Sequence, residues 1–142
     1  MLYNAIFIPP EDERPPFEII EHPDIAVYIE NFGRDGDLCL VAESEGAIIG
    51  AIWTRLFPGT RGGYGFVDTN TPELSMSVLE QHRRQGIGTK LLATMINRLS
   101  ENGYRQVSLS VDLANYAYHL YRKFGFVDYA RHEDSMTMLR QL

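Results

Sequence analysis

Residues 82–90, which read HRRQGIGTK, join a strand pattern to a helix pattern. The segment holds two glycines and three Lys or Arg residues, an unfavourable composition for the start of a helix. Glycine costs about 1 kcal/mol relative to alanine inside a helix, and each cation opposes the dipole at a helix N-terminus by about 0.3–1 kcal/mol. A bound anion offsets these costs, because the first N–H groups of a helix lack acceptors and glycine lets a ligand approach the backbone. The segment therefore predicts a phosphate-binding loop.

The loop lies inside a predicted strand–helix–strand unit. Residues 74–78 alternate apolar and polar side chains, apolar residues then recur at helical spacing from 87 to 99, and alternation resumes over 107–111. A connection between two parallel strands of one sheet is right-handed in almost all proteins. We therefore expect two parallel strands, with the loop at the carboxyl end of the first.

The rest of the chain predicts short elements in a single domain, residues 1–142, with a fold of the α/β (α+β) class. We expect a helix over 2–7, a helix from Pro23 to about Gly33, a hairpin of 38–43 and 47–57, a mobile loop over 58–71, a helix over 115–123 and a closing hairpin of 126–131 and 135–140.

The composition narrows the function classes. The net charge of −6 argues against a broad nucleic-acid surface, and no apolar run reaches the roughly 18 residues of a membrane span. No basic segment leads into an apolar run at the N-terminus, and the single cysteine, Cys39, fits a reducing cytoplasm. The four histidines form no H-x-x-x-H pair, so we expect no metal. We expect a cytoplasmic protein that binds neither nucleic acid nor membrane.

Two common phosphate motifs do not match the loop. The third glycine of G-x-G-x-x-G would fall at Leu91, and G-x-x-x-x-G-K-[ST] has no match. The pattern that remains is Arg83-x-x-Gly86-x-Gly88. Alone, it fits a plain glycine turn with solvated arginines equally well.

Together with its neighbours, the pattern resembles the GNAT superfamily of acyl-CoA-dependent N-acetyltransferases. Residues 73–78, ELSMSV, and the loop resemble motif A of that family, and residues 115–126, NYAYHLYRKFGF, resemble its motif B. The element order resembles the family over about residues 36–142. The resemblance implies a mixed, mostly antiparallel central sheet flanked by helices, acetyl-CoA as co-substrate, and a small-molecule or peptide amine as acceptor.

The resemblance also implies which residues bind acetyl-CoA. The backbone around Val78 would face the pantetheine arm and the thioester, and Arg83 occupies the first position of the loop motif. Asn115 and Tyr121 match the motif B positions that face the cofactor. The pyrophosphate would be bound by the backbone N–H groups of Arg84, Gly86, Ile87, Gly88 and Thr89.

The N-terminus departs from the family pattern. The family opens with a strand before its first helix, whereas this chain begins inside a predicted helix. Without that strand, the predicted strand at 38–43 becomes a sheet edge with unpaired backbone groups, which needs a cover. We expect the cover to be a second chain, as in a homodimer, or the segment 9–20.

The chemistry of amine acetylation makes a base more important than an acid. A lysine-like amine is about 0.04% neutral at pH 7, so its deprotonation costs about 4.6 kcal/mol, whereas the leaving thiolate costs about 2 kcal/mol. Some family members carry a glutamate base that acts through water at the position of Glu73; an exposed carboxylate at a strand start is the alternative. Tyr121 matches a tyrosine that protonates the departing sulfur in many members; a core aromatic is the alternative.

The acceptor side is less defined. The resemblance places Tyr28, Arg55 and Asp68 near it. We expect an enzyme that transfers the acetyl group to a primary amine by direct attack on the thioester. The alternative is a non-catalytic acyl-CoA-binding module that acts as a sensor or in assembly. The two differ at Glu73 and Tyr121, since only an enzyme needs groups that move a proton.

Overall fold

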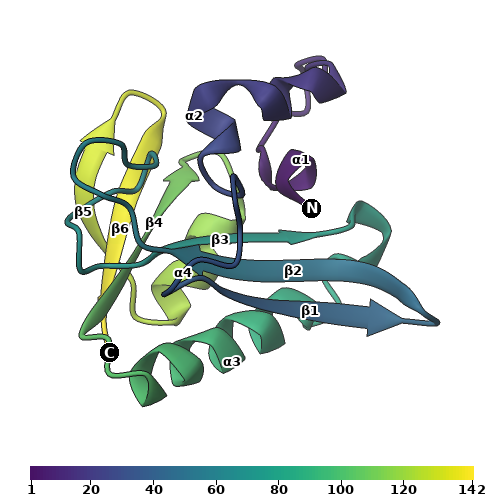
Figure 1. Cartoon of the computed structure of the whole chain (residues 1–142). Helices are drawn as coiled ribbons and strands as arrows, with labels where there is room; N and C mark the ends of the chain where they lie inside the picture. Colours follow the sequence, from purple (N-terminus) through teal and green to yellow (C-terminus); the bar gives the residue numbers. More distant parts are fainter.

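The computed structural model describes residues 1–142 and contains one six-stranded sheet (Figure 1). The strands are β1 (Leu38–Ser44), β2 (Ala47–Arg55), β3 (Glu73–Val78), β4 (Gln106–Asp112), β5 (Val127–His132) and β6 (Ser135–Gln141), in the order β1-β2-β3-β4-β6-β5. All neighbours are antiparallel except β3 and β4, which are parallel. The predicted mixed, mostly antiparallel sheet and its parallel strand pair are confirmed.

Helices cover both faces of this sheet (Figure 1). They are α1 (Leu2–Ala5), α2 (Pro23–Ala26), α3 (Ile87–Glu101) and α4 (Ala117–Lys123), with the 3₁₀ turns η1 (Phe17–Glu21) and η2 (Glu80–His82). α3 and α4 pack on one face, and α1, η1 and α2 lie on the other. No helix combines the length and the apolar character needed to cross a lipid bilayer.

Apolar spacing along α3 explains the larger of two core clusters. Leu92, Met95 and Leu99 recur three and four residues apart, so they lie on one face of the helix, and all three are fully buried against the sheet. The smaller cluster, on the opposite face, joins Leu2 of α1 to Trp53 of β2. This second cluster fixes the N-terminal segment over the middle of the sheet.

β3 and β4 are paired at one end only. The Ser108 N–H group donates to the Pro72 carbonyl oxygen (3.0 Å), and Glu73 and Ser108 form the single bridge between the two strands. β3 stays paired with β2, and β4 with β6, along their lengths. Backbone groups alternate sides along a strand, so those of Met76 and Val78 point, like the Pro72 carbonyl, toward β4, where no strand pairs with them. The two strands therefore separate toward their carboxyl ends.

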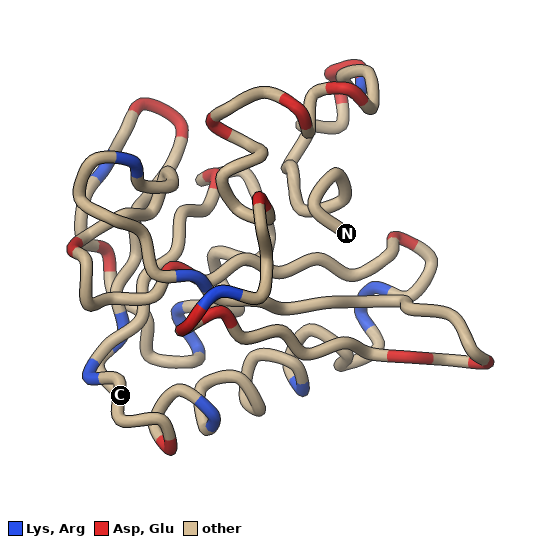
Figure 2. The backbone as a smooth tube through the Cα atoms, in the orientation of Figure 1, with Lys and Arg blue, Asp and Glu red and all other residues tan.

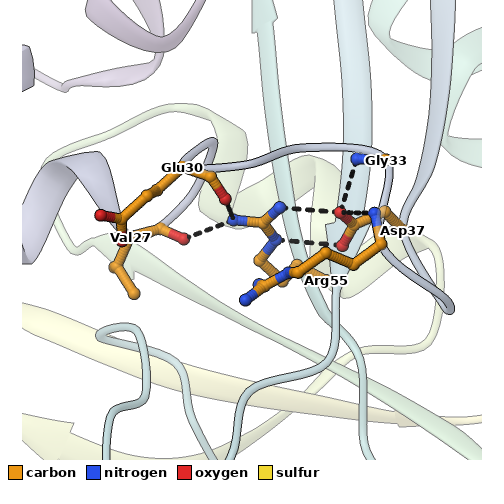
Figure 3. Close-up of polar contacts among 6 residues, drawn as sticks. Val27, Glu30, Gly33, Asp37 and Arg55 are labelled. Carbon is orange, nitrogen blue, oxygen red and sulfur yellow. Dashed lines mark hydrogen bonds and ion pairs between the residues drawn. The ribbon is translucent and has the colours of Figure 1, made fainter.

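The N-terminal helices are shorter than predicted. α1 ends at Ala5 rather than at residue 7, and α2 ends at Ala26, well before the predicted end near residue 33. The Arg55 side chain accounts for the early end of α2, because its Nη1 atom donates to the carbonyl oxygens of Val27 (2.9 Å) and Glu30 (2.7 Å) (Figure 3). Those two carbonyls are thereby withdrawn from a continuing helix.

β1 forms one edge of the sheet. The segment 9–20 does not cover this edge, because no backbone hydrogen bond joins it to β1. That part of the prediction is wrong: the segment folds over the sheet through η1 instead of running beside β1. The outer side of β1 is therefore open in the single chain.

Candidate active site

The predicted phosphate loop presents a run of free backbone N–H groups. The N-cap of α3 is Gly86, with a φ of 81°, and Arg84 also has a positive φ of 59°. No backbone N–H group of residues 84–89 donates a hydrogen bond, and the first bond into the helix runs from the Lys90 N–H to the Gly86 carbonyl oxygen (3.0 Å). Successive free N–H groups at a helix N-terminus form a concave anion site. The free N–H groups are available to an anion such as a pyrophosphate, and the phosphate loop stays a prediction, because every helix N-terminus leaves such groups free.

Basic residues lie in this loop and in the first turn of α3 (Figure 2). Arg84 and Lys90 are exposed, and neither takes part in a salt bridge. Arg83 instead donates from Nε to the carbonyl oxygen of Val78 (3.0 Å). That bond ties the loop to the end of β3 and takes up the carbonyl of Val78, so the free cations of the loop are Arg84 and Lys90.

Three elements meet beside the separated end of β3. A Cβ atom added at Gly88 would make ordinary contact with Met76 of β3 (3.6 Å) and with Leu120 of α4 (3.9 Å). Asn115 precedes α4, and its Oδ1 accepts a hydrogen bond from the Ala117 N–H group (2.9 Å), whereas its side-chain Nδ2 group has no partner in the chain. The loop, β3 and α4 therefore frame one region of the molecule.

Tyr121 lies in α4 as a buried aromatic residue. Its ring packs edge-on against Phe126 at 5.7 Å between centroids, and both belong to the larger core cluster. Burial raises the pKa of Tyr121 to about 12, so the phenol stays protonated at neutral pH. Tyr121 is thus the core aromatic that the sequence left as the alternative, and its role as a proton donor stays a prediction.

Glu73, the first residue of β3, is almost completely buried at 2% exposure. Its Oε1 atom accepts hydrogen bonds from Tyr28 Oη (2.7 Å) and from the Gly65 N–H group (2.9 Å), whereas its Oε2 atom has no partner. Burial raises the pKa of Glu73 to about 7, against the opposing effect of the two hydrogen bonds. The alternative of a solvent-exposed carboxylate is excluded, and the group is balanced between acid and base at neutral pH.

Tyr28 connects Glu73 to the loop before β3. Its hydroxyl donates to Glu73 and accepts from the Tyr64 N–H group (2.7 Å), and its ring packs against those of Phe57 (5.8 Å, edge-on) and Tyr64 (6.5 Å, stacked). Burial and the nearby Glu73 carboxylate raise the pKa of Tyr28 far above its usual value, so the phenol stays neutral. Of the three residues predicted on the acceptor side, Tyr28 alone forms a hydrogen bond with Glu73.

Arg55 has a structural position instead. Its Nε and Nη2 atoms form a two-bond ion pair with Asp37 (3.0 and 2.7 Å), and its Nη1 atom holds the two carbonyl groups that end α2 (Figure 3). The side chain is 1% exposed. Its donors bond to Asp37 and to the two carbonyl groups, so Arg55 holds the segment before β1 in place. It offers no free donor to an acceptor.

Asp68 is likewise engaged within the fold. Its Oδ1 atom accepts from the Asn70 N–H group and the Thr71 hydroxyl (both 2.8 Å), and its Oδ2 atom accepts from Gln106 Nε2 (3.3 Å). These bonds anchor the loop to β4. The sequence interpretation missed Tyr64 and Gly65, which contact the Tyr28–Glu73 pair; the glycines of this loop were the only signal.

The chain belongs to the acetyltransferase (GNAT) family, whose model matches residues 3–126. It is an N-acetyltransferase, an enzyme that transfers an acetyl group from acetyl-CoA to an amine. The non-catalytic binding module is therefore set aside.

Related proteins carry N-acetyltransferase names. An N-alpha-acetyltransferase of Sulfurisphaera tokodaii is 34% identical, over 81% of this chain and 75% of the relative, and one of Sulfolobus acidocaldarius is 30% identical over the same shares. Among solved structures, a ribosomal-protein-alanine N-acetyltransferase of Brucella melitensis has a TM-score of 0.65 at 29% identity, covering 82% of this chain and 76% of that one. The fold also matches a PaiA N-acetyltransferase of Thermoplasma acidophilum in complex with coenzyme A, with a TM-score of 0.61 at 20% identity, covering 75% of this chain and 61% of that one.

Proposed function

We propose that the protein acetylates the α-amino group of a peptide or protein N-terminus, with Glu73 as the base. The observation that carries this proposal is a buried carboxylate with a pKa of about 7 and one unpaired oxygen atom. Relatives named N-alpha-acetyltransferase and a structural neighbour named ribosomal-protein-alanine N-acetyltransferase support the same acceptor class.

The pKa of Glu73 matches an α-amine better than a lysine. An α-ammonium group has a pKa near 7.7–8.0, so its proton moves to a base with a pKa of about 7 at a cost of about 1 kcal/mol. A lysine ammonium group, with a pKa near 10.4, would lose its proton to the same base at about 4–5 kcal/mol. Since general bases work best when their pKa lies near the working pH, Glu73 suits the α-amine.

We assign acetyl-CoA to the loop and the separated strands. Acetyl-CoA supplies the acetyl group, and CoA leaves as the thiolate. The free N–H groups of residues 84–89 would bind its pyrophosphate, with Arg84 and Lys90 adding charge. The open edge of β3 at Met76 and Val78 would receive the pantetheine arm, and the side-chain Nδ2 group of Asn115 would lie alongside it. Tyr121 would donate a proton to the departing sulfur.

We propose direct attack by the amine, without an acyl-enzyme. The one cysteine of the chain, Cys39, lies on β1, two strands from Glu73 in the sheet, and burial raises the pKa of its thiol. A thiol held in its protonated form is a poor nucleophile. Its persistence as a free thiol also fits the cytoplasmic location that we propose.

The charge distribution favours a cationic acceptor. Seven of the nineteen acidic residues and one of the thirteen Lys and Arg residues fall within residues 1–30, so this segment carries the whole net charge of −6 (Figure 2). The same segment supplies Tyr28 to the site. A field of this sign attracts an ammonium group, and the basic loop attracts the anionic co-substrate separately.

Two peptides distinguish an α-amine from a lysine acceptor. The first has a free N-terminus and no lysine, and the second has a blocked N-terminus and one lysine. With release of free thiol from acetyl-CoA as the readout, we expect kcat/KM at neutral pH to be about 10²–10³-fold higher for the first peptide, because the neutral fractions of the two amines differ by a factor in that range. Equal or faster acetylation of the blocked peptide would overturn the proposal.

A further inference from the structure

Two segments of the chain donate hydrogen bonds to one oxygen atom of Glu73, and a third hydrogen bond joins these two segments. Oε1 accepts from Tyr28, which follows α2, and from Gly65, which lies in the loop before β3. The Tyr28 hydroxyl in turn accepts from the main chain of Tyr64. This closed set of hydrogen bonds fixes the direction of the carboxylate plane, so the other oxygen, Oε2, has a defined orientation.

Gly63 lies directly over that other oxygen. A Cβ atom built at Gly63 would overlap Glu73 Oε2 and would lie 2.6 Å from Tyr28 Oη, so no residue larger than glycine fits there without movement. Oε2 is buried and has no hydrogen-bond partner. The segment 62–65 therefore closes off the one oxygen atom of Glu73 that is free to take a proton from an acceptor.

Few hydrogen bonds hold the segment 62–65, apart from those that it makes to Tyr28 and Glu73. The Phe66 N–H group donates to the Gly63 carbonyl oxygen (3.2 Å), and the Thr137 hydroxyl donates to that of Tyr64 (3.4 Å). The other two bonds end on Tyr28 and Glu73 themselves. In contrast, the rings of Tyr28 and Phe57 are buried in the smaller core cluster, so Tyr28 remains in place when the loop moves.

We propose that Tyr28 is a positioning residue that holds Glu73 by Oε1, and that the segment 62–65 is a cover that the acceptor amine displaces to reach Oε2. The proposal rests on Glu73 being the base of the proposed function. Tyr28 acts through Glu73 and transfers no proton itself. The cover keeps water from the carboxylate until an acceptor arrives.

The charged groups around Glu73 leave it as the one group that titrates near neutral pH. Tyr28 faces it from the segment after α2 and Tyr64 from the loop, both as phenols. Arg55 lies opposite Glu73 in the neighbouring strand β2, but the Arg55 guanidinium is paired with Asp37. Ser108 faces it from β4 with a neutral hydroxyl. The acid limb of the pH profile of kcat/KM, which is the fall in rate toward low pH, therefore reports Glu73 together with the acceptor amine. The amine contributes equally in every variant, so a difference between variants reports Glu73.

Two variants should shift this limb in opposite directions. Tyr28→Phe removes a hydrogen bond that favours the carboxylate, so we expect the acid limb to move to higher pH and kcat at neutral pH to fall about tenfold, with KM for acetyl-CoA unchanged. Gly63→Ala prevents the cover from closing and admits water to Glu73, so we expect the limb to move to lower pH. Tyr3→Phe, which removes a tyrosine hydrogen bond to Pro15 in the same N-terminal segment, should leave the limb unmoved.

NMR titration of ¹³C-labelled glutamate carboxyl groups, with Glu73→Gln to assign the signal, measures the same pKa without turnover. Opposite shifts in the two variants support the proposal. No shift, or shifts in one direction, overturns it, provided that each variant keeps a cooperative unfolding transition. If Tyr28→Phe unfolds, Tyr28→Leu replaces it; if Gly63→Ala unfolds, Tyr64→Ala replaces it, because it removes an exposed ring of the same segment that stacks on Tyr28. If Glu73→Gln retains full turnover, Glu73 is not the base and the proposed function is contradicted. If Glu73→Gln is inactive but the acid limb is unmoved in Tyr28→Phe and Gly63→Ala, Glu73 remains the base and the roles of Tyr28 and the segment 62–65 are contradicted.

Discussion

At the residue scale, the properties of Glu73 come from residues distant in the sequence. Its strand supplies only the position at the start of β3, whereas Tyr28 and Gly65 supply the hydrogen bonds to its carboxylate. Burial without a positive partner raises the pKa of a carboxyl group, and two donors limit the rise. The basicity of this carboxylate is therefore a tertiary property.

Replacing Glu73 with glutamine tests its role as base. We expect turnover at neutral pH to fall about 10²–10⁴-fold, with partial recovery as pH rises and more free amine becomes available. Tyr121→Phe is the matched comparison and should cost less, because a thiolate is already a tolerable leaving group. Profiles of kcat against pH for both variants provide the measurement. Unchanged turnover in Glu73→Gln between about pH 6 and 9 would contradict the assignment.

The same carboxyl group predicts a pH-dependent stability. Its pKa is about 7 in the folded chain, against an ordinary value of 4.5, so between these values the folded state binds more protons than the unfolded state. The free energy of unfolding should therefore fall as pH rises through this range, by up to about 3 kcal/mol. Glu73→Gln lacks the titrating group and should lack this loss. Urea unfolding of both proteins at about pH 5 and about pH 8 measures it; a pH-independent difference between them would rule it out.

At the element scale, the sequence predicted what depends on local patterns. The alternation in β3, the helical spacing of α3 and the glycine loop between them are encoded within 73–101, and the structure has each of them where expected. The end of α2 depends on Arg55, which is far away in the sequence and takes its carbonyl groups. The sequence also could not show that the Arg55 guanidinium pairs with Asp37, because this ion pair forms only in the folded chain.

Gly86→Asp tests the loop as an anion site. The carboxylate would repel the pyrophosphate at the free N–H groups, so we expect acetyl-CoA affinity to fall at least about tenfold by calorimetry. Gly103→Asp is the matched control, because Gly103 has nearly the same φ (82° against 81°), lies just beyond the other end of α3 and, like Gly86, has no atom within 4 Å of an added Cβ. Equal losses in both variants would show that the effect comes from the backbone conformation.

At the scale of the whole molecule, the two edges of the sheet differ in their protection. β5 carries Asp128 and Arg131 along the outer edge, as charged residues do in strands that stay unpaired. β1 has no charged residue between 38 and 42, and a register shift between Ala42 and Glu43 limits the unprotected part to these five positions. We therefore propose β1 as the contact of a homodimer, in which two copies pair edge to edge.

Placing a charge on β1 should prevent this association. Val41 is half-exposed in the middle of the strand, so Val41→Lys puts a cation on each copy where the two edges meet, and we expect the protein to sediment as a monomer at concentrations where the parent chain forms dimers. Val127→Lys is the matched control, since Val127 is a similarly exposed valine on β5. Dissociation by Val127→Lys but not by Val41→Lys would place the interface at the opposite edge. A parent chain that stays monomeric throughout would show that the open edge of β1 is tolerated without a partner, because five residues of strand pairing do not offset the entropy lost when two chains associate.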